Sequence, residues 1–346
     1  MSKKGKIRDG AQNQHYVPKF ILRNFLWDAK KELVNVIDKR SSNTFTPNIA
    51  GIMGERRFNE FVIDDHMIAT FEPAVRKVEN LVKPAYDKVI SDRRLDNSEE
   101  QKALLAYLIA FQLLRTKSQR DQFTQMDDAI REKWSGIPEI AEELAEMDDP
   151  AVLKARHAEF MSEALGDFAA IIAEKDFLLM EAPADRSFYI ADNPVAMFNN
   201  EPAHPFWGNI GLSVLGIQIY LPIAHDLTLC AWCPSVAGKH RAETGAMMEQ
   251  YKSALIGKLM RGEIGPSEVK AANAMVDEAS EPIRRVLEHI ENGTPIMAKD
   301  SQMDFYNSLQ MRSSVRHVIC PRGDFALAKR FIADAPKHNG PKVRVG

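Results

Sequence analysis

Residues 103–114 read ALLAYLIAFQLL, and this stretch decides most of the fold. As a helix it is apolar on every face except at Gln112, and a helix that is apolar all round is buried. Apolar stripes at helical spacing flank it at Ile68, Phe71, Val75, Val78, Val82 and at Leu153, Phe160, Leu165, Phe168, Ile172. We therefore predict a helical lobe over about residues 64–174, with the quoted stretch at its centre.

Short β-rich segments lie on both sides of this lobe. They cover residues 32–37, 57–63, 177–180, 187–191, 216–222, 227–233, 294–297 and 317–320, the last expected as an edge strand. A helical pattern returns over residues 236–292 and breaks at residues 262–266. Strands kept apart from helices favour α+β over alternating α/β. We predict a predominantly helical α+β fold, with one small antiparallel sheet built from N-terminal strands and strands of the C-terminal half.

The composition bounds the domain organisation and excludes some classes of protein. The chain has 346 residues, is 45% hydrophobic, and carries 45 Lys and Arg against 48 Asp and Glu, for a net charge of −3. This balance argues against a DNA coat protein, which needs a basic excess, but allows a local basic groove. We expect one compact domain over residues 13–335, between a flexible tail at 1–12 and a loose tail at 336–346.

Targeting signals give a further expectation. The sequence contains neither the apolar run of a secretory signal nor an apolar stretch long enough to span a membrane. Three cysteines in the whole chain fit a reducing compartment. We therefore expect a cytoplasmic protein with no membrane contact.

Several polar blocks resemble a known bacterial family. Residues 13–25 read NQHYVPKFILRNF, residues 112–116 read QLLRT, and residues 190–195 read IADNPV; Leu221, Pro222, Asn307, Gln310 and Arg316 match more faintly. Together they resemble the family called domain of unknown function 4238, although Ala191 stands where a Ser is expected. The resemblance implies no chemistry. It implies that the polar blocks form one site.

His15, Arg115 and Asp192 are the candidate catalytic residues. An imidazole such as His15 titrates near neutrality and can act as acid or base, or it can simply cap a helix. The guanidinium of Arg115, at the end of a buried helix, can clamp a carboxylate or phosphate, or pair internally with Glu72 or Asp192. Asp192 follows a predicted strand and can orient His15 or bind a metal, or it can form an Asx-turn.

Five further side chains are candidates for substrate contact or for support of the catalytic groups: Gln14, Glu72, Gln112, Asn193 and Asn307. A buried amide such as Gln112 must find hydrogen-bond partners, since an unsatisfied one costs about 1–3 kcal/mol. Glu72 precedes Pro73 inside a helical stripe, where it can cap a helix segment or face Arg115, and Asn193 precedes Pro194 in a turn. Asn307 and Gln310 share a face of a late helix.

Other motifs carry weaker signals. Cys230 and Cys233 form a C-x-x-C inside an apolar strand, where packing is the simpler explanation than redox chemistry. A zinc site joining these cysteines to His317 and Cys320 has plausible spacing within each pair only, so we assign no metal and no cofactor. The common nucleotide, zincin and serine-hydrolase motifs are absent from the sequence.

These observations lead to three functional hypotheses. The first is a hydrolase-like enzyme, with nucleases among the candidates, that acts on a phosphate-bearing substrate, with a nucleic acid or nucleotide as partner. The second is a non-catalytic binding or regulatory module in which the same residues form a buried structural network. The third is a helical ribonuclease that uses Arg312 and His317 on one helix face. One open cleft around His15, Arg115 and Asp192 would favour the first, and sealed, separately paired side chains would favour the second.

Overall fold

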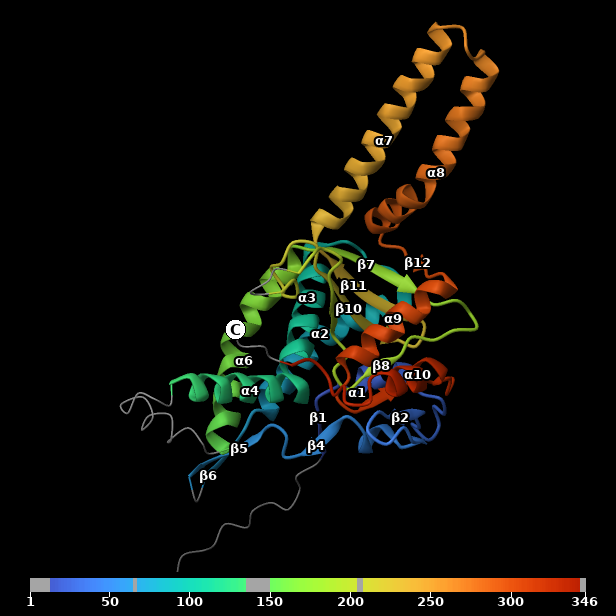
Figure 1. Cartoon of the computed structure of the whole chain (residues 1–346). Coiled ribbons are helices and arrows are strands. Elements are labelled where there is room, and N and C mark those ends of the chain that lie inside the picture. The colour runs from blue at the N-terminus through green and yellow to red at the C-terminus, as the bar shows by residue number, and fades with distance from the viewer. Residues whose placement is uncertain (1–12, 65–66, 135–149, 204–207, 343–346) are drawn as a thin grey trace, which may run out of the picture.

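Helix α3 (Glu99–Leu114) runs through the middle of the helical part of the protein (Figure 1). The structure is a computed structural model that describes residues 13–64, 67–134, 150–203 and 208–342. The helix begins at Ser98, whose hydroxyl accepts a hydrogen bond from the Gln101 N–H, and most of its side chains are buried. The expectation of a buried central helix is confirmed.

The other helices of this part pack around α3. They are α2 (Glu72–Asp92), α4 (Lys117–Trp134) and α6 (Pro150–Ala173), and both α2 and α6 lie directly against α3. The predicted lobe began too early, because β5 (Glu60–Asp64) and β6 (Met67–Thr70) form a hairpin before α2. Pro73 sits in the first turn of α2, where its missing N–H is harmless, so the helix starts there.

The strands form several sheets, and the prediction of one sheet was wrong. Strands β7 (Asp176–Glu181), β9 (Ala196–Phe198), β10 (Gln218–Ala224), β11 (Leu227–Trp232) and β12 (Ile296–Met297) form a sheet in the order β12-β7-β11-β10-β9. All neighbours in it are antiparallel except β12 and β7. The segment 187–191 does not join this sheet, because only Ile190 and Ala191 form a strand, and that strand pairs elsewhere.

A second sheet joins the two ends of the chain, as the α+β prediction required. Strands β2 (Val36–Asp38), β3 (Thr44–Phe45), β8 (Ile190–Ala191) and β13 (His317–Ile319) lie in the order β3-β2-β13-β8. Strand β13 was expected at an edge but is interior, since it pairs with β2 on one side and β8 on the other. Its residues Val318 and Ile319 are fully buried for that reason.

The N-terminal segment is built into the core. Strand β1 (Asn13–His15) pairs with β4 (Gly54–Arg56), and the short helix α1 (Lys19–Leu22) follows. Val17, Ile21, Leu22 and Phe25 are all inaccessible to solvent. The predicted tail at residues 1–12 lies outside the described residues. Of the predicted tail at 336–346, residues up to 342 are described, and His338 accepts a hydrogen bond from Lys39.

Helices α7 (Pro234–Met260) and α8 (Pro266–Asn292) form a long antiparallel hairpin that projects from the rest of the protein (Figure 1). The predicted break at residues 262–266 is its turn. At its base, Gly293 has a φ of +65° and approaches the Leu95 carbonyl so closely that a Cβ atom would lie 2.1 Å from that oxygen. Helices α9 (Asp300–Ser313) and α10 (Ala326–Asp334) complete the fold. No helix of the described ranges is long and apolar enough to cross a membrane.

Candidate functional site

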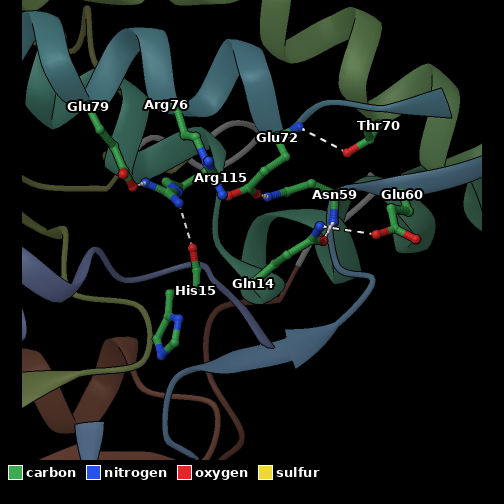
Figure 2. A network of polar contacts seen from close by, with 9 residues as sticks. All are labelled: Gln14, His15, Asn59, Glu60, Thr70, Glu72, Arg76, Glu79 and Arg115. Carbon is green, nitrogen blue, oxygen red and sulfur yellow. Dashed lines mark hydrogen bonds and ion pairs between the residues drawn. The ribbon is translucent and has the colours of Figure 1, made fainter. Parts of the chain in front are cut away.

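Gln14 links β1 to the β5–β6 hairpin. Its side-chain oxygen accepts a hydrogen bond from the Asn59 N–H at 2.6 Å, and its amide nitrogen donates to Glu60 at 3.3 Å (Figure 2). Asn59 in turn donates to Glu72 at 2.9 Å, and Arg76 donates to the other oxygen of the same carboxylate. Gln14 and Glu72, both predicted site residues, therefore belong to one network at the start of α2.

Arg115 lies beside that network with only 4% of its side chain exposed. Its guanidinium donates to the Glu79 carboxylate at 2.6 Å and to the His15 carbonyl (Figure 2). It also stacks over the Phe111 ring. The predicted internal partners, Glu72 and Asp192, were wrong. Glu79 lies seven residues beyond Glu72, on the same face of α2, and it is the residue that α2 presents to Arg115.

The His15 imidazole faces away from Arg115. Its Nε2 lies 2.9 Å from the Ile49 carbonyl. The backbone carbonyl of His15, in contrast, accepts a hydrogen bond from Arg115 (Figure 2). Partial burial lowers the pKa of His15, the Ile49 carbonyl opposes that shift, and Lys19 and Arg115 reinforce it. The ring is therefore a neutral donor to the main chain at neutral pH.

Asp192 is a backbone anchor. Its carboxylate is 5% exposed and accepts hydrogen bonds from the N–H groups of Val315, Arg316 and His317, at 2.9, 2.8 and 2.9 Å. Burial raises the pKa of Asp192 although these three donors oppose the shift. The predicted Asx-turn was wrong, because the carboxylate holds the distant turn between α9 and β13.

Three amide side chains fasten α9 to the segment 187–194. Asn193 accepts from the Thr116 hydroxyl at 3.0 Å and donates to the Ser313 carbonyl. Asn307 accepts from the Tyr189 N–H and donates to the Ser187 carbonyl, and Gln310 accepts from the Ala191 N–H. Each amide replaces hydrogen bonds that a sheet would have supplied, so these residues position main chain.

Gln112 fastens the N-terminal segment to α3. Its side chain is fully buried, and its amide nitrogen donates to the Tyr16 carbonyl at 2.9 Å. Its side-chain oxygen has no hydrogen-bond partner among the described residues. Of the hydrogen-bond partners predicted for the Gln112 amide, the structure therefore provides one for the nitrogen and, among the described residues, none for the oxygen.

The segments that contain His15, Arg115 and Asp192 do converge, but their charged side chains do not share a cleft. Arg115 bonds to residues 15 and 79, the His15 ring to Ile49, and Asp192 to residues 315–317. Arg115 and Asp192 are both at most 5% exposed. Buried groups with their own partners are the arrangement of a structural network.

An open cavity of about 920 Å³ adjoins the Asn193 end of this network. It lies between the junction of α3 and α4, the segment around β9, and the end of α9. Its polar lining consists of Gln119, Gln122, Asn193, Asn209, Arg312, Ser313 and Lys342. Among the lining residues that the structure describes, none is acidic. The sequence pattern gave no signal for Gln119, Gln122, Asn209 or Lys342. These residues belong to segments that are far apart in the sequence and come together only in the fold.

Arg312 and Lys342 are the cations of this cavity. Both are exposed, and neither takes part in an ion pair within the described part of the chain. The third hypothesis needs Arg312 and His317 on one helix, but α9 ends at Ser313 and His317 begins β13. The His317 ring instead lies 3.9 Å from the Asp38 carboxylate. That reading of the two residues was wrong.

The cysteines do not assemble a site. Cys230 is buried within β11, while Cys233 follows that strand and immediately precedes α7, so the motif is not wholly inside the strand as predicted. Cys230 and Cys320 belong to separate hydrophobic clusters. Across residues 13–64, 67–134, 150–203 and 208–342, no three His, Cys, Asp or Glu side chains are grouped as metal ligands.

Comparison with known proteins gives one match. A family model described as "Protein of unknown function (DUF4238)" matches residues 13–323. No curated protein and no solved structure matches the chain.

Proposed function

The chain belongs to the DUF4238 family, whose description gives no activity, and we propose from the lining of its cavity beside Asn193 that it binds a phosphate-bearing molecule there. The ligand class is a nucleotide or the end of a nucleic acid strand. The observation that carries the proposal is Arg312, an exposed guanidinium on a cavity wall with no acidic partner among the described residues.

The charge and polarity of the lining support an anionic ligand. A guanidinium fork matches two phosphate oxygens, and the Lys342 ammonium adds a second positive charge. The Gln119 amide can donate to a further oxygen or to a base edge, whereas the amide nitrogens of Gln122 and Asn209 already donate to Ser118 and to the Glu201 carbonyl. A carboxylate on the wall would repel such a ligand, and the described lining has none.

The size and the apolar part of the lining support a ligand with a ring. A volume of about 920 Å³ lies within the range of about 300–1,000 Å³ that small-molecule sites occupy. The remaining wall is apolar and includes Leu113, Val195, Met197, Ile210 and Leu309. A nucleobase can pack on these side chains while its phosphates meet Arg312, since ligand sites combine apolar walls with a few polar groups.

Binding is favoured over hydrolysis by the chemistry of the same walls. Hydrolysis of a phosphate ester calls for an acid or base beside the reacting atoms, and the described lining contains no Asp, Glu or His. His15, Arg115 and Asp192 do not line the cavity. They support the second hypothesis, in which buried polar residues are the scaffold of a binding module. We therefore set the hydrolase and nuclease hypothesis aside.

Calorimetric titration of the full chain tests the proposal, with ATP, GTP and a single-stranded RNA oligonucleotide as separate probes. The wild type should bind at least one probe, and Arg312→Met should weaken that binding by about tenfold or more, because a hydrogen bond to a charged group contributes about 1.5–3 kcal/mol. Lys342→Met should weaken it less.

Arg284→Met is the matched control, since Arg284 is an exposed arginine on α8 and its side chain does not line the cavity. Its affinity should equal that of the wild type. If the wild type binds none of the three probes, or if Arg312→Met and Arg284→Met bind equally well, the proposal is wrong.

A further inference from the structure

The α7–α8 hairpin exposes several large apolar side chains that the rest of the chain does not cover. Each helix has 27 residues, and they pack on each other away from the main body (Figure 1). Its exposed large apolar side chains are Tyr251, Ile256, Leu259, Met260 and Met275, with Ile256 60% and Met260 82% exposed. Exposed apolar side chains gathered in one place mark an interaction surface.

These side chains gather in the half of the hairpin that lies near its turn. On α7, Lys252, Ile256 and Met260 follow one another at intervals of four residues and so share a helix face. The chain leaves more than half of Ile256 and most of Met260 exposed. A partner that packs along this face would remove both side chains from water.

The charges of the two helices are opposite in sign. Residues 234–260 contain four Lys and Arg against two Glu, whereas residues 266–292 contain three Lys and Arg against six Asp and Glu. Lys252 and Lys258 on α7, and Asp277 and Glu278 on α8, form no ion pair within the described chain. The hairpin therefore offers unpaired positive charge on one helix and unpaired negative charge on the other.

We propose that this hairpin is the interface for a second copy of the same chain, with α7 of each copy packed on α8 of the other. An identical hairpin supplies both the acidic helix that α7 needs and the basic helix that α8 needs. Two such hairpins related by a two-fold axis make a four-helix bundle, a common packing of helix pairs. The nearly equal numbers of acidic and basic residues disfavour a nucleic acid as the occupant.

The size of the surface is sufficient for a stable pair. A helix of 27 residues is about 40 Å long, and two helices side by side are about 20 Å wide. The whole hairpin face therefore spans about 800 Å² for each partner, which is the typical area of a specific protein interface, and its exposed apolar side chains lie in the half near the turn.

Sedimentation velocity and light scattering of the full chain test this interface. The wild type should be a dimer at micromolar concentration. The double substitution Ile256→Glu and Met260→Glu should raise the dissociation constant by at least about a hundredfold, since two buried apolar anchors are lost. The matched control is Leu215→Glu, which changes another exposed apolar residue, 68% exposed, outside the hairpin. This control should remain dimeric.

A charge exchange distinguishes this interface from any other contact. The variant Lys252→Glu, whose changed residue lies on the face of Ile256 and Met260, and the variant Asp277→Lys with Glu278→Lys should each be largely monomeric, because like charges then face each other. Mixed together, they should form a heterodimer, with circular dichroism confirming that each is folded. A monomeric wild type, or a mixture of the two charge variants that stays monomeric, would overturn the proposal.

Discussion

Replacing Arg115 by Met tests whether the buried polar residues are a scaffold. The substitution keeps a long side chain over Phe111 and removes the two hydrogen bonds to Glu79 and to the His15 carbonyl. If Arg115 is structural, the loss should appear in the free energy of unfolding and not in ligand binding.

The structure sets the size of the effect. Each hydrogen bond that involves a charged group contributes about 1.5–3 kcal/mol. The Glu79 side chain is 27% exposed, so water partly replaces its lost partner, whereas the His15 carbonyl loses a nearly buried donor. We expect a loss of about 3 kcal/mol, which is a large fraction of the 5–15 kcal/mol that stabilises a typical protein.

Urea unfolding followed by circular dichroism measures this loss. The control is Arg76→Met, because Arg76 also pairs with a glutamate of α2 but is 67% exposed, and such surface pairs contribute about 1 kcal/mol or less. A loss below about 1 kcal/mol for Arg115→Met, or equal losses in the two variants, would refute the structural role of Arg115.

Three further substitutions test other parts of the account. Asp192→Asn should lower the unfolding free energy by at least about 2 kcal/mol, because the new amide directs N–H groups at backbone donors; unchanged urea midpoints would contradict the anchor. Gly293→Ala should lower the melting temperature, since its Cβ would meet the Leu95 carbonyl, and a melting curve equal to that of the wild type would exclude this close approach. Burial lowers the pKa of His157, a residue of α6, from 6.5 to about 4. As the pH drops, the unfolded chain therefore takes up a proton before the folded chain does, and the free energy of unfolding falls by about 3 kcal/mol between pH 6.5 and pH 4. His157→Phe should flatten the curve of unfolding free energy against pH in that range. Parallel curves for the wild type and the variant would show that His157 does not cause the pH dependence.

Much of the fold follows from local patterns. The apolar helix at residues 99–114, the helix pair on either side of residues 262–266, and the meeting of N-terminal and C-terminal strands were all predictable, because periodicity and turn residues report on neighbours in sequence. The interior place of β13 was not, since strand order depends on partners at least 127 residues away in the chain. Val318, for example, pairs with Ala191 on one side and with Ile37 on the other.

The candidate site, too, could be predicted only as far as it depends on residues close together in the sequence. An internal ion pair was one of the two alternatives for Arg115, and the structure has one, but with Glu79. Glu72 and Glu79 lie on the same face of α2, and only the packing of α2 on α3 selects between them. The lining of the cavity was still less visible. Residues 119, 122, 209 and 342 carry no shared motif and come together only when α4, the segment after β9 and the chain end are placed in space.

The central claim is a division of roles between Arg115 in the buried network and Arg312 in the open cavity. Calorimetric titration of Arg115→Met and Arg312→Met with the probe that the wild type binds, at a temperature where both variants are folded, tests it most directly. We predict that Arg115→Met keeps the wild-type affinity and that Arg312→Met loses about tenfold or more. Lost affinity in Arg115→Met, with Arg312→Met unchanged, would contradict the account.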